Sequence, residues 1–219
     1  MNIRNYDREM EEILRGHRER GERKTLLLHA CCAPCASACL MRVMQDLAVT
    51  VFYYNPNITD RDEYEKRVAE CRRLTGLLNA EYKTDVAFLE GAYEPELFFE
   101  MSKGLEDVPE RGERCFRCYE QRLKKTAEIA AQQGFTYFAT TLTLSPLKNA
   151  QKLNEIGFQL EKTSDVLYLP SDFKKRDGYR LSVELSEKYG LYRQNYCGCV
   201  YSARQTAGPD KTGSLQFPG

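Results

Sequence analysis

The sequence carries no net charge and no long apolar run. Its 219 residues contain 32 lysines and arginines against 32 aspartates and glutamates, so a globally basic nucleic-acid binder is not indicated and only a local basic pocket is compatible with the charge. No stretch approaches the roughly 20 apolar residues that cross a bilayer. Residues 1–16 are charged throughout and lack the apolar segment of a secretory signal. We therefore expect a cytoplasmic protein that does not engage a membrane.

Histidine is scarce, which limits imidazole as a metal ligand or proton carrier. Only His17 and His29 are present. His17 lies in a charged, helix-like segment and is expected to face solvent. His29 lies on an apolar run two residues before Cys31, where it is expected either in the core or beside a metal ligand that it orients.

Cysteine, by contrast, is abundant. There are nine, and a reducing compartment disfavours stable structural disulfides, so clustered thiols indicate metal or redox chemistry. Eight of the nine form three clusters: Cys31, Cys32, Cys35 and Cys39; Cys115 and Cys118; Cys197 and Cys199. Cys71 stands alone in a helical pattern and is expected in the core, as is Cys39.

Apolar periodicity predicts alternating strands and helices. Strands are expected over 24–30, 47–55, 80–85, 135–142 and 165–170, and helices over 6–20, 36–47, 59–79, 93–103, 114–134, 147–162 and 181–190. This alternation predicts an α/β fold with an open, mostly parallel sheet and helices on both faces. We expect a helical extension over 1–22, one catalytic domain over 23–205 and a flexible tail over 206–219. In such sheets ligands bind beyond the carboxyl ends of the strands.

Four of the thiols suit a metal centre. Cys115 and Cys118 are three residues apart at the start of a helix, so both face the same side, and the helix N-terminus favours thiolate. With Cys31 and Cys32 they supply four thiolates, the number that structural zinc and iron–sulfur clusters commonly use. Adjacent cysteines chelate one small ion awkwardly but can reach different irons of a cluster, so the spacing favours the cluster. Three roles remain for Cys35: it could replace Cys31 or Cys32 as a ligand, hold a second metal, or contact the substrate.

The segment Cys197-Gly198-Cys199 differs from the other clusters. A disulfide between two such cysteines closes a small strained ring, and glycine relieves part of the strain. Strained disulfides are easily reduced, which suits catalysis or electron relay. A further metal-binding pair or uninvolved thiols are the alternatives.

Polar residues near the predicted strand ends are the candidates for substrate binding. Arg193 stands among tyrosines, a mixture that pairs with phosphate and stacks on bases. Asn55 and Asn57 can instead simply shape the turn in which they lie. The candidate set is Tyr54, Asn55, Asn57, Thr140, Thr141, Ser145, Lys148 and Arg193.

Five segments in order resemble one family, the cobalamin-independent epoxyqueuosine reductases known as QueH. They are LLHACCAPC (27–35), YNPNI (54–58), RCFRCYEQRL (114–123), FATTLTLSPLKN (138–149) and YRQNYCGCVYS (192–202). The resemblance covers most of residues 25–202. It implies a Rossmann-like fold similar to that of adenine-nucleotide α-hydrolases, and deoxygenation of epoxyqueuosine to queuosine at the wobble position of tRNA.

The resemblance also implies the cofactors and their ligands. A 4Fe–4S cluster would be held by Cys31, Cys32, Cys115 and Cys118, with Cys197 and Cys199 as a redox-active disulfide. Cys35 would serve catalysis, with an additional iron as a candidate cofactor. Electrons would come from an external donor similar to ferredoxin or flavodoxin. The alternatives are a zinc-stabilised nucleic-acid-binding module without redox activity and a metal-free thiol–disulfide oxidoreductase.

Overall fold

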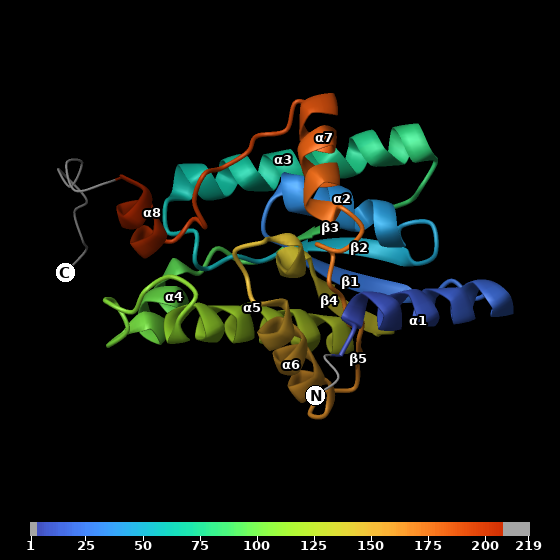
Figure 1. Ribbon diagram of the computed structural model, residues 1–219, viewed down its shortest axis with the longest axis horizontal. Helices are drawn as coiled ribbons and strands as arrows, with labels where there is room; N and C mark the ends of the chain where they lie inside the picture. Colours follow the sequence, from blue (N-terminus) through green and yellow to red (C-terminus); the bar gives the residue numbers. More distant parts are fainter. Residues whose placement is uncertain (1–3, 208–219) are drawn as a thin grey trace.

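A five-stranded, all-parallel sheet forms the centre of the protein (Figure 1). The computed structural model describes residues 4–207. The strand order is β3-β2-β1-β4-β5, with bounds Thr25–Ala30 (β1), Ala48–Tyr53 (β2), Ala87–Glu90 (β3), Tyr137–Thr140 (β4) and Leu167–Tyr168 (β5). The expected α/β class with an open parallel sheet is confirmed.

Helices cover both faces of this sheet. In Figure 1, α2, α3 and α7 lie above it, and α4, α5 and α6 lie below. The helices span Tyr6–Arg20 (α1), Ala33–Val43 (α2), Arg61–Tyr82 (α3), Pro95–Ser102 (α4), Glu113–Gln132 (α5), Ala150–Glu161 (α6), Gly178–Lys188 (α7) and Val200–Ala207 (α8), with a 3-10 turn (η1) at Thr141–Leu144. No helix within residues 4–207 combines the length and apolar character that a bilayer span requires.

The first strand shows how the sequence produces two cores. Side chains alternate across a strand, so Leu26 and Leu28 enter the core under α2 and α3, whereas Leu27 enters the core that α5 and α6 cover. Met10 and Leu14 of α1 join the first core and are fully buried. Every strand residue from Leu26 to Ala30 is buried, as expected for a central parallel strand.

The end of α3 and the presence of α8 differ from the sequence expectation. The strand expected over 80–85 is wrong, because α3 continues to Tyr82 and ends at Lys83 in the left-handed region (φ 55°). The strand that follows begins at Ala87 instead. α8 was not expected, and of the tail expected over 206–219, residues 208–219 lie outside the described part. The division into an N-terminal extension, a single catalytic domain and a tail stays a prediction.

The strand order creates one special edge. β1 pairs with β2 on one side and with β4 on the other. Connections after β1 and β4 leave in opposite directions, and such a switch point opens a crevice at the carboxyl ends of the strands. The segment that begins at Cys31 follows β1, and the segment that begins at Thr141 follows β4. The unusual polar motifs therefore meet at the edge where this fold binds ligands.

Candidate active site

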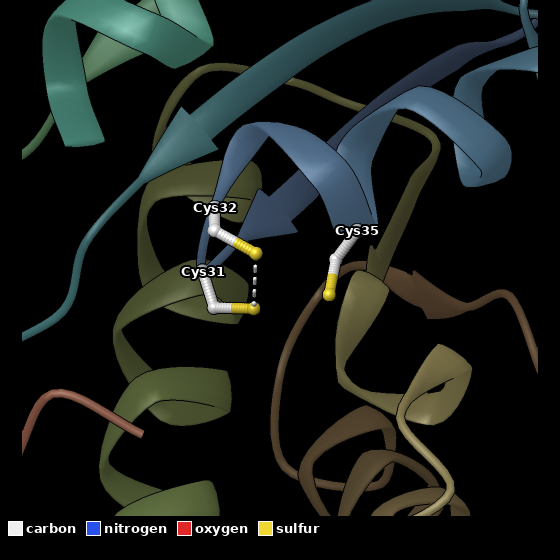
Figure 2. A group of neighbouring side chains, drawn as sticks. All are labelled: Cys31, Cys32 and Cys35. Carbon is white, nitrogen blue, oxygen red and sulfur yellow. Dashed lines mark hydrogen bonds between the residues drawn. The ribbon is translucent and has the colours of Figure 1, made fainter. Parts of the chain in front are cut away.

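Three sulfurs converge where β1 passes into α2. The Sγ atoms of Cys31, Cys32 and Cys35 all lie within 4.8 Å of one another (Figure 2). Cys32 is the N-cap of α2 in extended conformation, and a proline in the first turn suits a helix start. The helix begins at Ala33, so Cys35 lies on its first turn and returns toward the other two. These three thiols can hold a metal together.

Within the group of Cys31, Cys32 and Cys35, the surroundings favour the thiolate form of Cys31 and the thiol form of Cys32. Cys32 is 1% exposed and Cys31 9% exposed. Hydrogen bonds from Cys32 and then Cys35 hold the pKa of the Cys31 thiol well below its usual value. The pKa of Cys32 is raised to about 12, first by its hydrogen bond to Cys31. A buried site that already stabilises one thiolate is suited to a cation, which would deprotonate the remaining thiols on binding.

Cys115 and Cys118 occupy the first turns of α5, as the sequence predicted. Cys118 is 5% exposed, and the backbone N–H of Arg111 donates to Cys115 Sγ at 3.3 Å. Burial raises the pKa of Cys118 to about 11. They line a small cavity together with Cys197 and Cys199.

Two cavities adjoin at this edge of the sheet. The larger has a volume of about 340 Å³ and includes Cys31, Cys32 and Cys35 in its lining. The smaller, of about 20 Å³, includes Cys115, Cys118 and Cys199. Five residues line both: Glu110, Arg122, Lys148, Cys197 and Ser202. Seven cysteines thus surround two adjoining cavities, but the close group of three sulfurs contains Cys35 and neither cysteine of α5.

The loop that carries Cys197 is fixed by two buried polar side chains. Asn57 Nδ2 and Arg67 Nη1 each donate to the Cys197 carbonyl at 3.3 Å. Arg67 is 1% exposed and ion-paired with Glu63 at 2.6 Å. The structure holds Cys197 and Cys199 as thiols, and burial raises the pKa of Cys199 to about 12.

Gly198, between these two cysteines, has no room for a side chain. Its φ is +106°, and an added Cβ would lie 2.7 Å from Ile58 Cγ1 and 3.3 Å from Arg67 Nη1. We expect Gly198→Ala to lower the free energy of unfolding by about 1–3 kcal/mol, since both the backbone and the packing resist it. Urea unfolding measures this loss. Gly76 occupies an exposed position of α3, where an added Cβ meets nothing within 4 Å, so Gly76→Ala is the control, with an expected gain in the free energy of unfolding of about 0.5–1 kcal/mol. A Gly198→Ala protein as stable as wild type would contradict the conclusion that position 198 requires glycine.

The predicted substrate residues divide into two groups. Ser145, Lys148 and Arg193 line the larger cavity, and Asn57 lines the smaller. The others contact the framework. Tyr54 donates to Glu94 at 3.0 Å, Asn55 donates to the Ala30 carbonyl at 2.9 Å, and Thr140 accepts from the Leu142 N–H at 3.1 Å. Thr141 is fully buried with its hydroxyl 3.9 Å from Cys31 Sγ.

Lys148 brings a permanent positive charge to both cavities. Burial opposes its charge, but coulombic attraction to Cys197, Cys31 and Cys35 in their thiolate forms outweighs burial and raises its pKa above the usual value. Arg193 instead turns toward α7, where it donates to the Ser182 carbonyl and the Ser186 hydroxyl, each at 3.1 Å. Lys148 is therefore the candidate cation that faces a bound substrate.

Both histidines are buried, and the expectation that His17 faces solvent is wrong. His17 is 4% exposed because it reaches Tyr137 Oη at 3.0 Å across the sheet end. His29 donates from Nε2 to the Tyr54 carbonyl at 3.0 Å, and its Nδ1 lies 2.9 Å from Thr140 Oγ1. Burial, followed by the charge of Arg122, lowers the pKa of His29 to about 3, so the ring is neutral at pH 7. His29 ties β1 to its two neighbouring strands.

Sequence reasoning missed three residues of the site. Arg67 and Arg122 are each 1% exposed, and Tyr179, at the larger cavity, is 47% exposed. For Arg122 a signal existed, since it follows Cys118 by four residues and so shares its helix face. Arg67 and Tyr179 carry no such mark, because only the packing of α3 and α7 against the last loop brings them to the cavity.

Comparison with known proteins gives one consistent result. The family model described as epoxyqueuosine reductase QueH matches residues 26–205. A protein of Streptococcus pyogenes named epoxyqueuosine reductase QueH is 44% identical over 91% of this chain and 78% of its own length. Proteins with the same name from Staphylococcus epidermidis and Thermotoga maritima are 41% and 36% identical, covering 91% and 81% of this chain and 84% and 90% of their own lengths.

Proposed function

This chain belongs to the QueH family of epoxyqueuosine reductases, and we propose that it deoxygenates epoxyqueuosine to queuosine at the wobble position of tRNA, using a 4Fe–4S cluster. The chain is an oxidoreductase of tRNA queuosine biosynthesis. The proposed cluster rests on one observation: seven cysteines from three segments surround two adjoining cavities at the switch point of the sheet.

The donor chemistry fits such a cluster. In the proposal Cys31 and Cys32 act from the larger cavity, and Cys115 and Cys118 from the smaller. All four are thiols, and an iron–sulfur cluster takes four thiolates. Cys35 lies against Cys31 and Cys32, which supports a role for it in holding an additional iron. When bound, the cluster would supply single electrons, and an additional iron would supply Lewis acidity.

The reaction needs two electrons and two protons, because removing the epoxide oxygen as water leaves an alkene. In the proposal Cys197 and Cys199 cycle between dithiol and disulfide, which moves two electrons at once. Lys148 lines both cavities, and in the proposal its Nζ donates a hydrogen bond to the epoxide oxygen as the ring opens. His29 is neutral and held by backbone and hydroxyl partners, so its role is to fix the strand ends.

The proposed activity requires a tRNA substrate and an electron donor. The larger cavity accepts the wobble nucleoside, with Ser145 and Lys148 in its lining and the exposed ring of Tyr179 for base stacking. Electrons come from an external one-electron donor of the ferredoxin or flavodoxin kind. A tRNA-modifying enzyme of this type works in the cytoplasm.

One assay tests this function directly. The protein, reconstituted anaerobically with iron and sulfide, is incubated with dithionite and tRNA that carries epoxyqueuosine. We expect nucleoside mass spectrometry to show loss of one oxygen and formation of queuosine, and the protein to be brown from sulfur-to-iron charge transfer. Zinc in place of iron, a colourless protein, or unchanged epoxyqueuosine would overturn the proposal.

A further inference from the structure

Arg122 is a buried cation between the two groups of cysteines. It lies one turn after Cys118 on α5, is 1% exposed and lines both cavities. Its Nε donates to the Cys118 carbonyl at 3.2 Å, and its Nη1 donates to Asn55 Oδ1 at 3.3 Å. These bonds fix the guanidinium plane in one orientation.

The charge of Arg122 is not neutralised by the protein. Among residues 4–207, Arg42, Arg67 and Arg122 are arginines with a buried nitrogen that lacks a hydrogen-bond partner. Arg42 is ion-paired with Asp7 and Glu11, and Arg67 with Glu63. Within the same residues Arg122 forms no ion pair, and its Nη2 is the unpartnered atom. Burying an unpaired charge is costly, so a group of opposite charge in the cavity is expected to offset that cost.

The surroundings identify sulfur as that opposite charge. Arg122 shares the lining of the larger cavity with Cys31, Cys32 and Cys35, and that of the smaller cavity with Cys115, Cys118 and Cys199. Glu110 is the one carboxylate on the lining of either cavity within the described residues, whereas Lys148, Arg67 and Arg193 add further positive charge to the larger one. A cation with a free N–H, set among thiols, matches a thiolate-bound inorganic cluster.

We propose that Arg122 is a positioning residue for the iron–sulfur cluster, donating its free Nη2–H to the cluster sulfurs and raising the reduction potential with its positive charge. The inference rests on the proposed 4Fe–4S cluster. One-electron reduction makes the cluster one unit more negative, and a nearby cation stabilises that state more than the oxidised one. Net charge and hydrogen bonds to sulfur are the properties that set such potentials.

The test is a potentiometric titration of the reconstituted protein, followed by electron paramagnetic resonance, with dithionite as reductant through redox mediators. We expect Arg122→Gln to shift the reduction equilibrium at least tenfold toward the oxidised cluster, which corresponds to a potential lower by about 59 mV for one electron. Arg122→Lys keeps the charge and is expected to shift it less than threefold. Arg42→Gln, which removes a half-buried arginine that lines neither cavity, is expected to leave the potential unchanged.

The outcomes separate the two proposals. A wild-type protein that binds no iron overturns the proposed cluster and this inference with it. A cluster whose potential is the same in wild type and Arg122→Gln overturns the inference alone, and so does an unchanged potential accompanied by a higher KM for tRNA, which would assign Arg122 to the substrate. If Arg122→Gln fails to fold, a shift in Arg122→Lys as large as tenfold contradicts the role of charge.

Discussion

Replacing Cys118 with serine is expected to abolish stable binding of the cluster and to lower activity at least about 100-fold. Cys118 is 5% exposed on α5, and serine oxygen is a poor substitute for a thiolate on iron. Changes to residues that merely support metal ligands already cost roughly 10–100-fold, so loss of a ligand should cost more. Iron and sulfide analysis of the reconstituted protein, together with queuosine formation, measures both effects.

Cys71→Ala is the matched control for this variant. Cys71 is also a buried helical cysteine, but it lies in the core under α3 and lines neither cavity. We expect the control to retain full iron content and brown colour at a modest cost in stability. A Cys118→Ser protein with the same iron content and activity as this control would remove Cys118 from the proposed ligand set.

Replacing both Cys197 and Cys199 with serine is expected to leave the cluster intact and to lower queuosine formation at least about 100-fold. A 4Fe–4S cluster passes electrons singly, whereas the reaction consumes two, so in the proposal the dithiol supplies both electrons as it becomes a disulfide. The experiment is a single turnover with the cluster reduced beforehand and no further reductant. Iron content is measured in the same sample.

Cys39→Ala serves as the control here, because Cys39 is fully buried on α2 and lines neither cavity. Unchanged iron with lost activity supports the relay. Full single-turnover activity in the double variant would remove the relay from the mechanism, and lost iron would instead assign these cysteines to the metal.

The central strands were predictable because their signal is local. Residues 24–30 and 47–55 are apolar runs of strand length, and the structure forms β1 and β2 there with changes of only one or two residues. The strand over 80–85 was misplaced because a helix end at Lys83 depends on a left-handed residue that the sequence does not mark. α8 was missed because its short run follows directly on the Cys-Gly-Cys turn.

The site was predictable in its residue types but not in its arrangement. Spacing alone paired Cys115 with Cys118 and identified Gly198 as a special position. The grouping of Cys35 with Cys31 and Cys32 depends on α2 starting at Ala33, three residues earlier than expected. His17 was misassigned because its partner, Tyr137, is 120 residues away. Long-range contacts of this kind carry no local pattern.

Cys197 and Cys199, the two thiols of the last loop, differ in their exposure to solvent. Cys197 is half-buried and borders both cavities, while Cys199 is 8% exposed and borders only the smaller one. The Cys197 carbonyl accepts hydrogen bonds from Asn57 and Arg67, and Asn57 Nδ2 also lies 3.9 Å from the Cys197 sulfur, so the backbone beneath that sulfur is held in place. An incoming reductant or alkylating reagent therefore encounters Cys197 first, and Cys199 acts as the sheltered partner that closes the exchange.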